Sequence, residues 1–146
     1  MNINLKDVKQ MSTYAFYWSE ARLLIAAVAL LLGGIPPIML IMPIPLVGAL
    51  LTLSWIISGV ASAYLAYQWY AHDFRVFGGK DTFDMAAFGV LIVSGLNLGI
   101  VGILGTNIGM NISSSYAVFV LAAVAYVASA GWLYKRYTAH HQTIFS

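Results

Sequence analysis

The chain has 146 residues, of which 61% are hydrophobic and 8% are charged, and its formal net charge is +2. Soluble domains have about 25% charged residues, so this composition excludes an ordinary soluble protein and predicts an integral membrane protein. The small net charge gives no argument for nucleic-acid binding. Because the chain has no cysteine, disulfides, thiolate metal sites and cysteine nucleophiles are also excluded.

Two stretches contain no Asp, Glu, Lys or Arg, and together they predict the fold. They cover residues 23–72 and 85–134, each 50 residues long. A bilayer core needs about 20 apolar residues per helix, so each stretch holds two crossings and a turn. We therefore expect an all-α, four-helix transmembrane domain over residues 1–146. Residues 1–72 would form a first hairpin, 73–84 a cytoplasmic connector, and 85–146 a second hairpin with a short tail.

The first hairpin begins with a polar segment and an aromatic approach to the bilayer around Trp18. The N-terminus lacks the pattern of a cleaved signal peptide, so we expect the first helix to be retained. That helix is predicted over residues 19–35, because Pro36 and Pro37 cannot continue it. The turn then runs through Pro43 and Pro45, and a second helix is expected over residues 46–70.

The second hairpin begins after a turn at Gly78 and Gly79. Asp81 or Thr82 can cap a third helix over residues 84–105, with Asp84 at the positive end of its dipole. A polar loop follows, and the serines at 113–115 are candidate caps for a fourth helix over residues 114–134. Two basic residues then meet the negative end of that helix.

The basic residues predict the orientation in the membrane. All seven lie outside the uncharged stretches, in the segments before the first helix, between the second and third, and after the fourth. They are Lys6, Lys9, Arg22, Arg75, Lys80, Lys135 and Arg136. The loops at 36–45 and 106–113 have none, so the positive-inside rule predicts a multi-pass protein of the cell membrane with both termini in the cytoplasm.

The two hairpins show a limited internal similarity. A shift of 67 residues aligns the sequence Val-Ala-Ser-Ala at 60–63 with the same sequence at 127–130. Duplication would give a parallel repeat about an axis along the membrane normal. Coincidence in an Ala- and Ser-rich composition explains the match equally well, so both interpretations stay open.

Small residues predict where helices pack. The third helix carries Gly95, Gly99 and Gly102, and the second helix offers Gly59 and Ala63 at similar spacing. Such surfaces let helix backbones approach closely. The partner is either another helix of this chain or a helix of another subunit.

Polar residues within the predicted helices are few. Asn97 lies in the glycine-rich helix, where its amide can lock two helices together or contact a solute. In the second case Asn97, Asn107 and Asn111 would line a pore. We expect no ionisable group within the membrane, which argues against proton relays and coupled pumps. His72, His140 and His141 lie at the cytoplasmic end, where solvated histidines are more common than ligands, so we expect no metal or cofactor.

Residues 86–132 include Gly95-Leu96-Asn97-Leu98-Gly99, followed by Gly102, and this segment resembles a family of small two-helix bacterial membrane proteins. That family carries a G-x-N-W-G-x-x-G signature and has no established activity. Leu98 stands where the family has Trp. The resemblance implies a two-helix topology and a prokaryotic membrane, and it implies nothing about chemistry.

These observations favour a non-enzymatic role. We expect a structural or accessory subunit of a larger membrane complex or a homo-oligomer, in contact with lipid and with other membrane subunits or copies of itself. The alternative is an oligomeric pore or facilitator for a small solute or ion.

Overall fold

The computed structural model describes residues 5–42 and 45–145 of the chain. Within these residues, four helices are long and apolar enough to cross a membrane, which confirms the predicted all-α membrane fold. They are α1 (Leu5–Leu31), α3 (Pro45–Ala71), α4 (Thr82–Leu104) and α6 (Tyr116–Ala139). Two short helices, α2 (Pro37–Ile41) and α5 (Ile108–Ile112), lie within the predicted loops. Pro43, which was expected in the first turn, lies outside the described residues.

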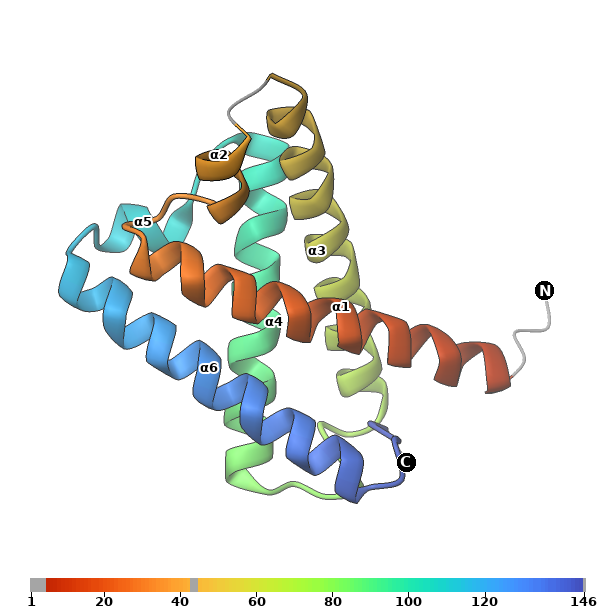
Figure 1. Ribbon diagram of the computed structural model, residues 1–146. Helices are drawn as coiled ribbons and strands as arrows, with labels where there is room; N and C mark the ends of the chain where they lie inside the picture. Colours follow the sequence, from red (N-terminus) through yellow and green to blue (C-terminus); the bar gives the residue numbers. More distant parts are fainter. Residues whose placement is uncertain (1–4, 43–44, 146) are drawn as a thin grey trace.

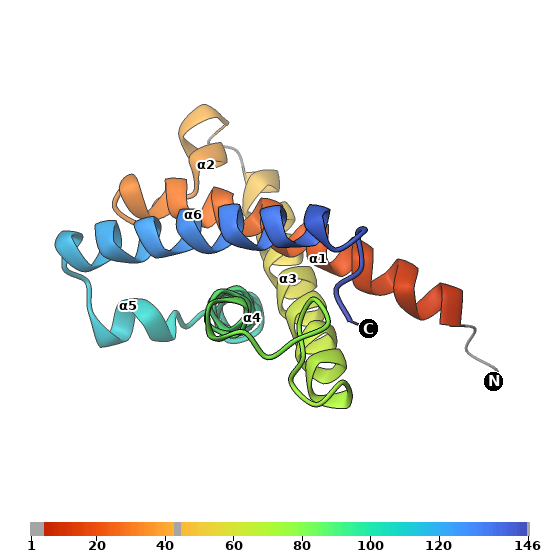
Figure 2. The same ribbon diagram turned by 90° about the horizontal axis from the view of Figure 1, so that it is seen from below.

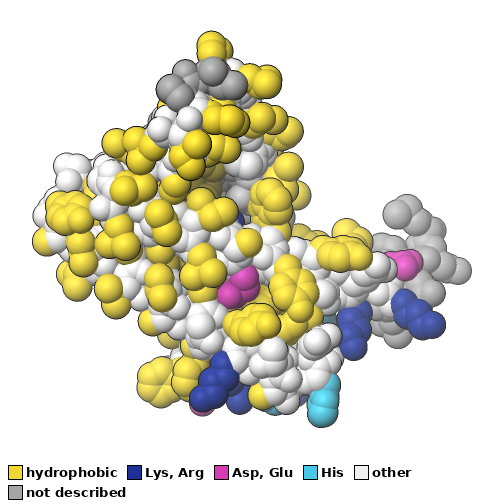
Figure 3. Space-filling model, viewed as in Figure 1, with side chains coloured by type: hydrophobic (Ala, Val, Ile, Leu, Met, Phe, Trp, Pro, Cys, Tyr) yellow, Lys and Arg dark blue, Asp and Glu magenta, His cyan; other side chains and the backbone are white. Residues whose placement is uncertain are grey.

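The long helices form two layers. Helices α1 and α6 lie side by side in one layer, and α3 and α4 pack together in the other (Figures 1 and 2). The two layers cross steeply, so they touch closely over part of their length and separate elsewhere. Apolar side chains are spread over the outer faces of the helices in Figure 3, whereas most of the visible basic side chains gather along one margin. This distribution suits a protein surrounded by lipid.

The prediction for the first helix was wrong at its start. Helix α1 begins at Leu5, far before the expected residue 19, so Arg22 lies inside the helix and not at its border. The reason is a buried stripe at helical spacing, which runs through Ser12, Phe16, Ser19, Leu23 and Ala27. Those positions recur every three or four residues, so tertiary packing holds the polar segment in the helix. The fourth helix likewise continues past residue 134 to Ala139.

Helix ends follow the local chemistry of the sequence. Gly33 and Gly34 adopt φ of +77° and +89° after α1, a conformation that favours glycine. The Asp81 carboxylate caps α4 by accepting hydrogen bonds from the backbone N–H groups of Phe83 and Asp84 at 2.9 and 3.2 Å. Gly105 ends the same helix with φ of +67°.

The α3–α4 connector and the C-terminal segment meet at one end of the molecule. The backbone N–H of Phe77 donates to the carbonyl of Ile144 at 2.7 Å. The rings of Phe16 and Tyr137 lie 4.9 Å apart beside Phe77, and all three side chains are buried. An aromatic core therefore ties α1, α6 and the connector together at this end.

Candidate functional site

A cavity of about 650 Å³ lies between the two helix layers. All four long helices contribute to its wall, and the short helix α5 and the prolines before and at the start of α2 border one end of it. Most of the lining side chains are apolar; its polar side chains include Arg22, Ser58, Ser94, Asn97 and Asn107. Ligand sites commonly have volumes of about 300–1,000 Å³, so the cavity is large enough for a small molecule.

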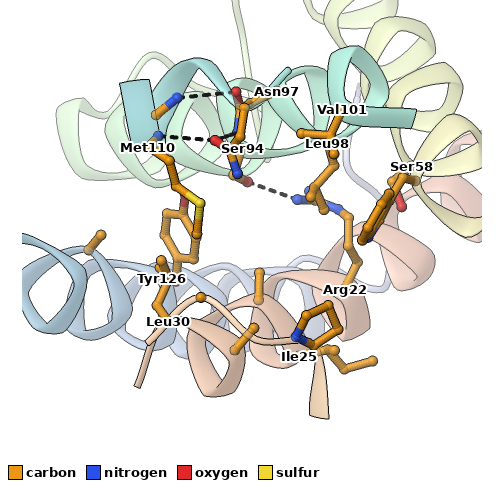
Figure 4. A pocket seen from close by; sticks show the side chains of 18 of the residues that line it. Arg22, Ile25, Leu30, Ser58, Ser94, Asn97, Leu98, Val101, Met110 and Tyr126 are labelled. Atoms are coloured by element: carbon orange, nitrogen blue, oxygen red, sulfur yellow. Dashed lines mark hydrogen bonds between the residues drawn. The ribbon is translucent and has the colours of Figure 1, made fainter. Parts of the chain in front are cut away.

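Arg22 is the charged residue in the wall of the cavity. Its side chain is only 6% exposed and reaches from α1 toward α4 (Figure 4). One terminal nitrogen donates to the Ser94 hydroxyl at 2.9 Å, and the other donates to the Leu91 carbonyl at 2.8 Å. Both acceptors are neutral, and Nε of Arg22 has no partner among the described residues. The cavity therefore has an electropositive wall.

Trp18 and Ser58 complete the polar side of the cavity near Arg22. The indole N–H of Trp18 donates to the Ser58 hydroxyl at 3.0 Å, and that hydroxyl donates to the Ser54 carbonyl at 2.7 Å. This chain of bonds joins α1 to α3 and satisfies both side chains. Of Trp18, Ser58 and Arg22, only Arg22 therefore still has an N–H group without an acceptor, at Nε.

Asn97 and Asn107, two of the three asparagines predicted as candidate pore residues, attach α5 to α4. The Asn97 amide donates to the Asn107 side-chain oxygen at 3.0 Å, and its own oxygen accepts from the backbone N–H of Ile108 at 3.0 Å. Asn107 also caps α5 by accepting from the backbone N–H of Met110 at 3.1 Å (Figure 4). Asn111 is exposed on α5 and is not part of this network.

The glycines predicted as packing residues lie mostly between α3 and α4. A Cβ added at Gly99 would be 2.7 Å from the Cα of Gly59, so the two backbones are in direct contact. Gly95 faces Ser62, and a Cβ at Gly102 would be 2.8 Å from the Ile56 side chain. Ala63 is exposed, because the stripe that faces α4 continues from Gly59 through Ser62 instead.

A second polar cluster joins the start of α4 to the end of α6. The fully buried carboxylate of Asp84 pairs with Arg136, whose nitrogens lie 2.6 to 3.0 Å from its oxygens. It also accepts the indole N–H of Trp132 at 2.8 Å. Asp84 was predicted only as an acid at the helix dipole, and its pairing across the bundle is not visible in the sequence.

The expectation that no ionisable group lies within the bundle was wrong. Arg22 and Glu20 are both buried in α1, and Oε1 of Glu20 has no partner among the described residues. Their burial was not expected because a helix that begins at residue 19 has both residues in its first turn, at the membrane border. The recurring stripe at Ser12, Phe16, Ser19 and Leu23 was the signal that the helix begins earlier.

The histidines lie apart from the cavity. Nδ1 of His72 donates to the Gln68 carbonyl at 2.7 Å, and the ring stacks on Phe145, while His140 stacks on Phe77. Among residues 5–42 and 45–145, no group of three or more His, Asp or Glu side chains is arranged to hold a metal ion. These histidines are thus held by contacts at the connector end of the bundle.

The fold and the cavity define a small integral membrane protein with four helices of membrane-spanning length. Comparisons with protein-family models, with curated proteins and with solved structures give no significant match. The resemblance of residues 86–132 to the two-helix bacterial family therefore stays a prediction.

Proposed function

We propose that this protein is a non-enzymatic structural or accessory subunit, which packs against another membrane helix in a larger complex or in a homo-oligomer. The glycines of α3 and α4 contact each other within this chain, so they are not free to contact a second subunit. Another surface must form that contact. The observation that supports the proposal is a row of small residues on the outer face of α6.

That face contains Ala125, Ala128 and Gly131, which are all exposed. They are spaced three residues apart, so neighbouring members of the row lie next to each other on the helix surface. A Cβ added at Gly131 would meet no atom within 4 Å. An exposed glycine in an apolar helix costs helix stability, and small residues permit close backbone contact between membrane helices. The row is therefore suited to a partner helix.

The test replaces Gly131 by Leu and measures the mass of the particle extracted in mild detergent. After the bound detergent is subtracted, the protein mass of the wild-type particle should be a multiple of the 15.8 kDa chain or include other subunits, and Gly131→Leu should reduce it to the monomer because the added side chain separates the helices. Gly48→Leu is the matched control, since Gly48 is also exposed and open on α3. A monomeric wild type, or equal loss with the control, would contradict the proposal.

The alternative role as a pore has weaker support. Asn97 and Asn107 would have to present their amides to a solute, but these amides bond to each other and to the backbone of α5. Flux of small solutes through reconstituted vesicles, abolished by Asn97→Leu, would favour the pore over the accessory role.

A further inference from the structure

The guanidinium of Arg22 is a buried positive charge with no carboxylate at ion-pair distance among the described residues. Arg22 forms no ion pair with any residue that the structure describes. Glu20, two residues away on the same helix, interacts with Arg22 electrostatically, but no hydrogen bond or ion pair joins the two side chains. A charge at the centre of a membrane helix costs about 2.5–3.5 kcal/mol on insertion scales. A bound anion would offset this cost.

The hydrogen-bonding capacity of Arg22 is only partly used. An arginine has five N–H donors in a planar fork, and here one donor goes to Ser94 and one to Leu91. The unpartnered Nε is more than nine-tenths buried with the rest of the side chain, and the side chain lines the cavity. The planar fork matches the two oxygens of a carboxylate.

The remainder of the cavity is suited to a hydrocarbon chain. Away from Arg22 the wall is built from side chains such as Ile25, Leu30, Leu98, Val101 and Phe119. A hydrocarbon chain there would exchange lipid tails for apolar side chains at little cost, whereas a small soluble anion would lose its hydration and leave this apolar volume unfilled. One positive charge also matches one carboxylate better than a doubly charged phosphate monoester.

We propose that the cavity binds a single-chain carboxylate amphiphile from the bilayer, such as a long-chain fatty acid, with its carboxylate on Arg22 and its chain among the apolar side chains toward α5. This binding site is separate from the outer face of α6. Because the ligand would contact both helix layers, its binding would change how the layers pack; in the accessory subunit proposed above, this would make the packing depend on lipid composition.

The test measures binding of radiolabelled palmitate to the whole protein in phosphatidylcholine nanodiscs. Wild type should bind it saturably at about one per chain, and Arg22→Gln should weaken binding at least about tenfold, as expected when one partner of a buried charge pair is removed. Arg75→Gln, an exposed arginine in the connector, is the matched control and should leave binding unchanged. Equal binding by wild type and Arg22→Gln would overturn the proposal.

Two further measurements keep the test decisive if Arg22→Gln folds poorly. Hexadecanol, which has the same chain length without the charge, should bind wild type at least about tenfold more weakly than palmitate. Ala122→Phe, which fills the wall on α6, should weaken palmitate more than octanoate because it shortens the space for the chain. Acetate that competes as well as palmitate, or hexadecanol that binds equally, would show that the site does not recognise a carboxylate amphiphile.

Discussion

At the scale of single residues, two buried charges in the bundle have different surroundings: Asp84 forms an ion pair, and Arg22 does not. Asp84 has three donor groups around its carboxylate, from Trp132 and from Nε and Nη2 of Arg136. Arg22 has only neutral acceptors. Since a buried charge is stable only when it is compensated, the first arrangement indicates a structural role, and the second is the basis of the proposed carboxylate site.

The Asp84 cluster predicts a measurable loss of stability. Asp84→Asn should lower the free energy of unfolding by about 1–3 kcal/mol, because it removes the charge opposite Arg136 and weakens the bond from Trp132. The Arg136 side chain is 30% exposed, so the loss should stay below that of a fully buried pair. Thermal and SDS-induced unfolding in one detergent would measure it.

The control for this prediction is at the start of the same helix. Asp81→Asn keeps a good capping side chain for Phe83 and Asp84, so it should change stability by less than about 0.5 kcal/mol. A double-mutant cycle with Arg136→Gln should give a coupling energy between positions 84 and 136. Additive losses would show that the ion pair does not contribute.

At the scale of elements, the closest helix contact is between α3 and α4. Gly99→Ala should destabilise the protein by about 1–3 kcal/mol, because its Cβ would be 2.7 Å from the Gly59 backbone and the helices would have to move apart. Gly89→Ala in the same helix meets no atom within 4 Å and should be neutral or slightly stabilising. Unfolding free energies of the two variants would be compared, and equal effects would contradict this packing.

The elements that the sequence predicted well are those determined by local chemistry. Asp81 and Gly105 set the ends of α4 through a side-chain cap and a left-handed C-cap, which need no tertiary partner. Helix α1 ends at Leu31, before the expected residue 35, because Gly33 and Gly34 adopt the left-handed conformation ahead of the prolines. The start of α1 depended instead on burial of Ser12, Phe16 and Ser19 against other helices. The bonds from Arg22 to Ser94 and Leu91 also depend on tertiary packing, because their partners are about 70 residues away in the chain. They could not be predicted from the sequence.

At the scale of the whole molecule, the crossing of the layers explains the cavity. Helices α1 and α6 cross α3 and α4 steeply (Figures 1 and 2), so side chains cannot fill the space where the layers separate. That space is bordered by α5, which Asn97 and Asn107 attach to α4. The cavity is therefore a consequence of the architecture, and Arg22 gives it chemical selectivity.

The final prediction concerns the sides of the membrane. Because the chain has no cysteine, single cysteines can be labelled with a membrane-impermeant maleimide without a background. Lys80 and Gln142 are exposed in segments that meet through the bond between Phe77 and Ile144, whereas Asn111 is exposed on α5 at the other end of α4. Lys80→Cys and Gln142→Cys should therefore react from the same side, and Asn111→Cys from the opposite side.

The distribution of basic residues predicts which of the two sides is cytoplasmic. Lys80→Cys and Gln142→Cys should react only after the membrane is opened, since their segments carry the positive charges that stay in the cytoplasm, and Asn111→Cys should react in intact cells. Labelling of all three from one side would contradict the four-crossing topology itself. If Lys80→Cys and Gln142→Cys react in intact cells and Asn111→Cys only after the membrane is opened, the four-crossing topology still holds but the termini are not in the cytoplasm. The topology and the orientation are thus tested separately.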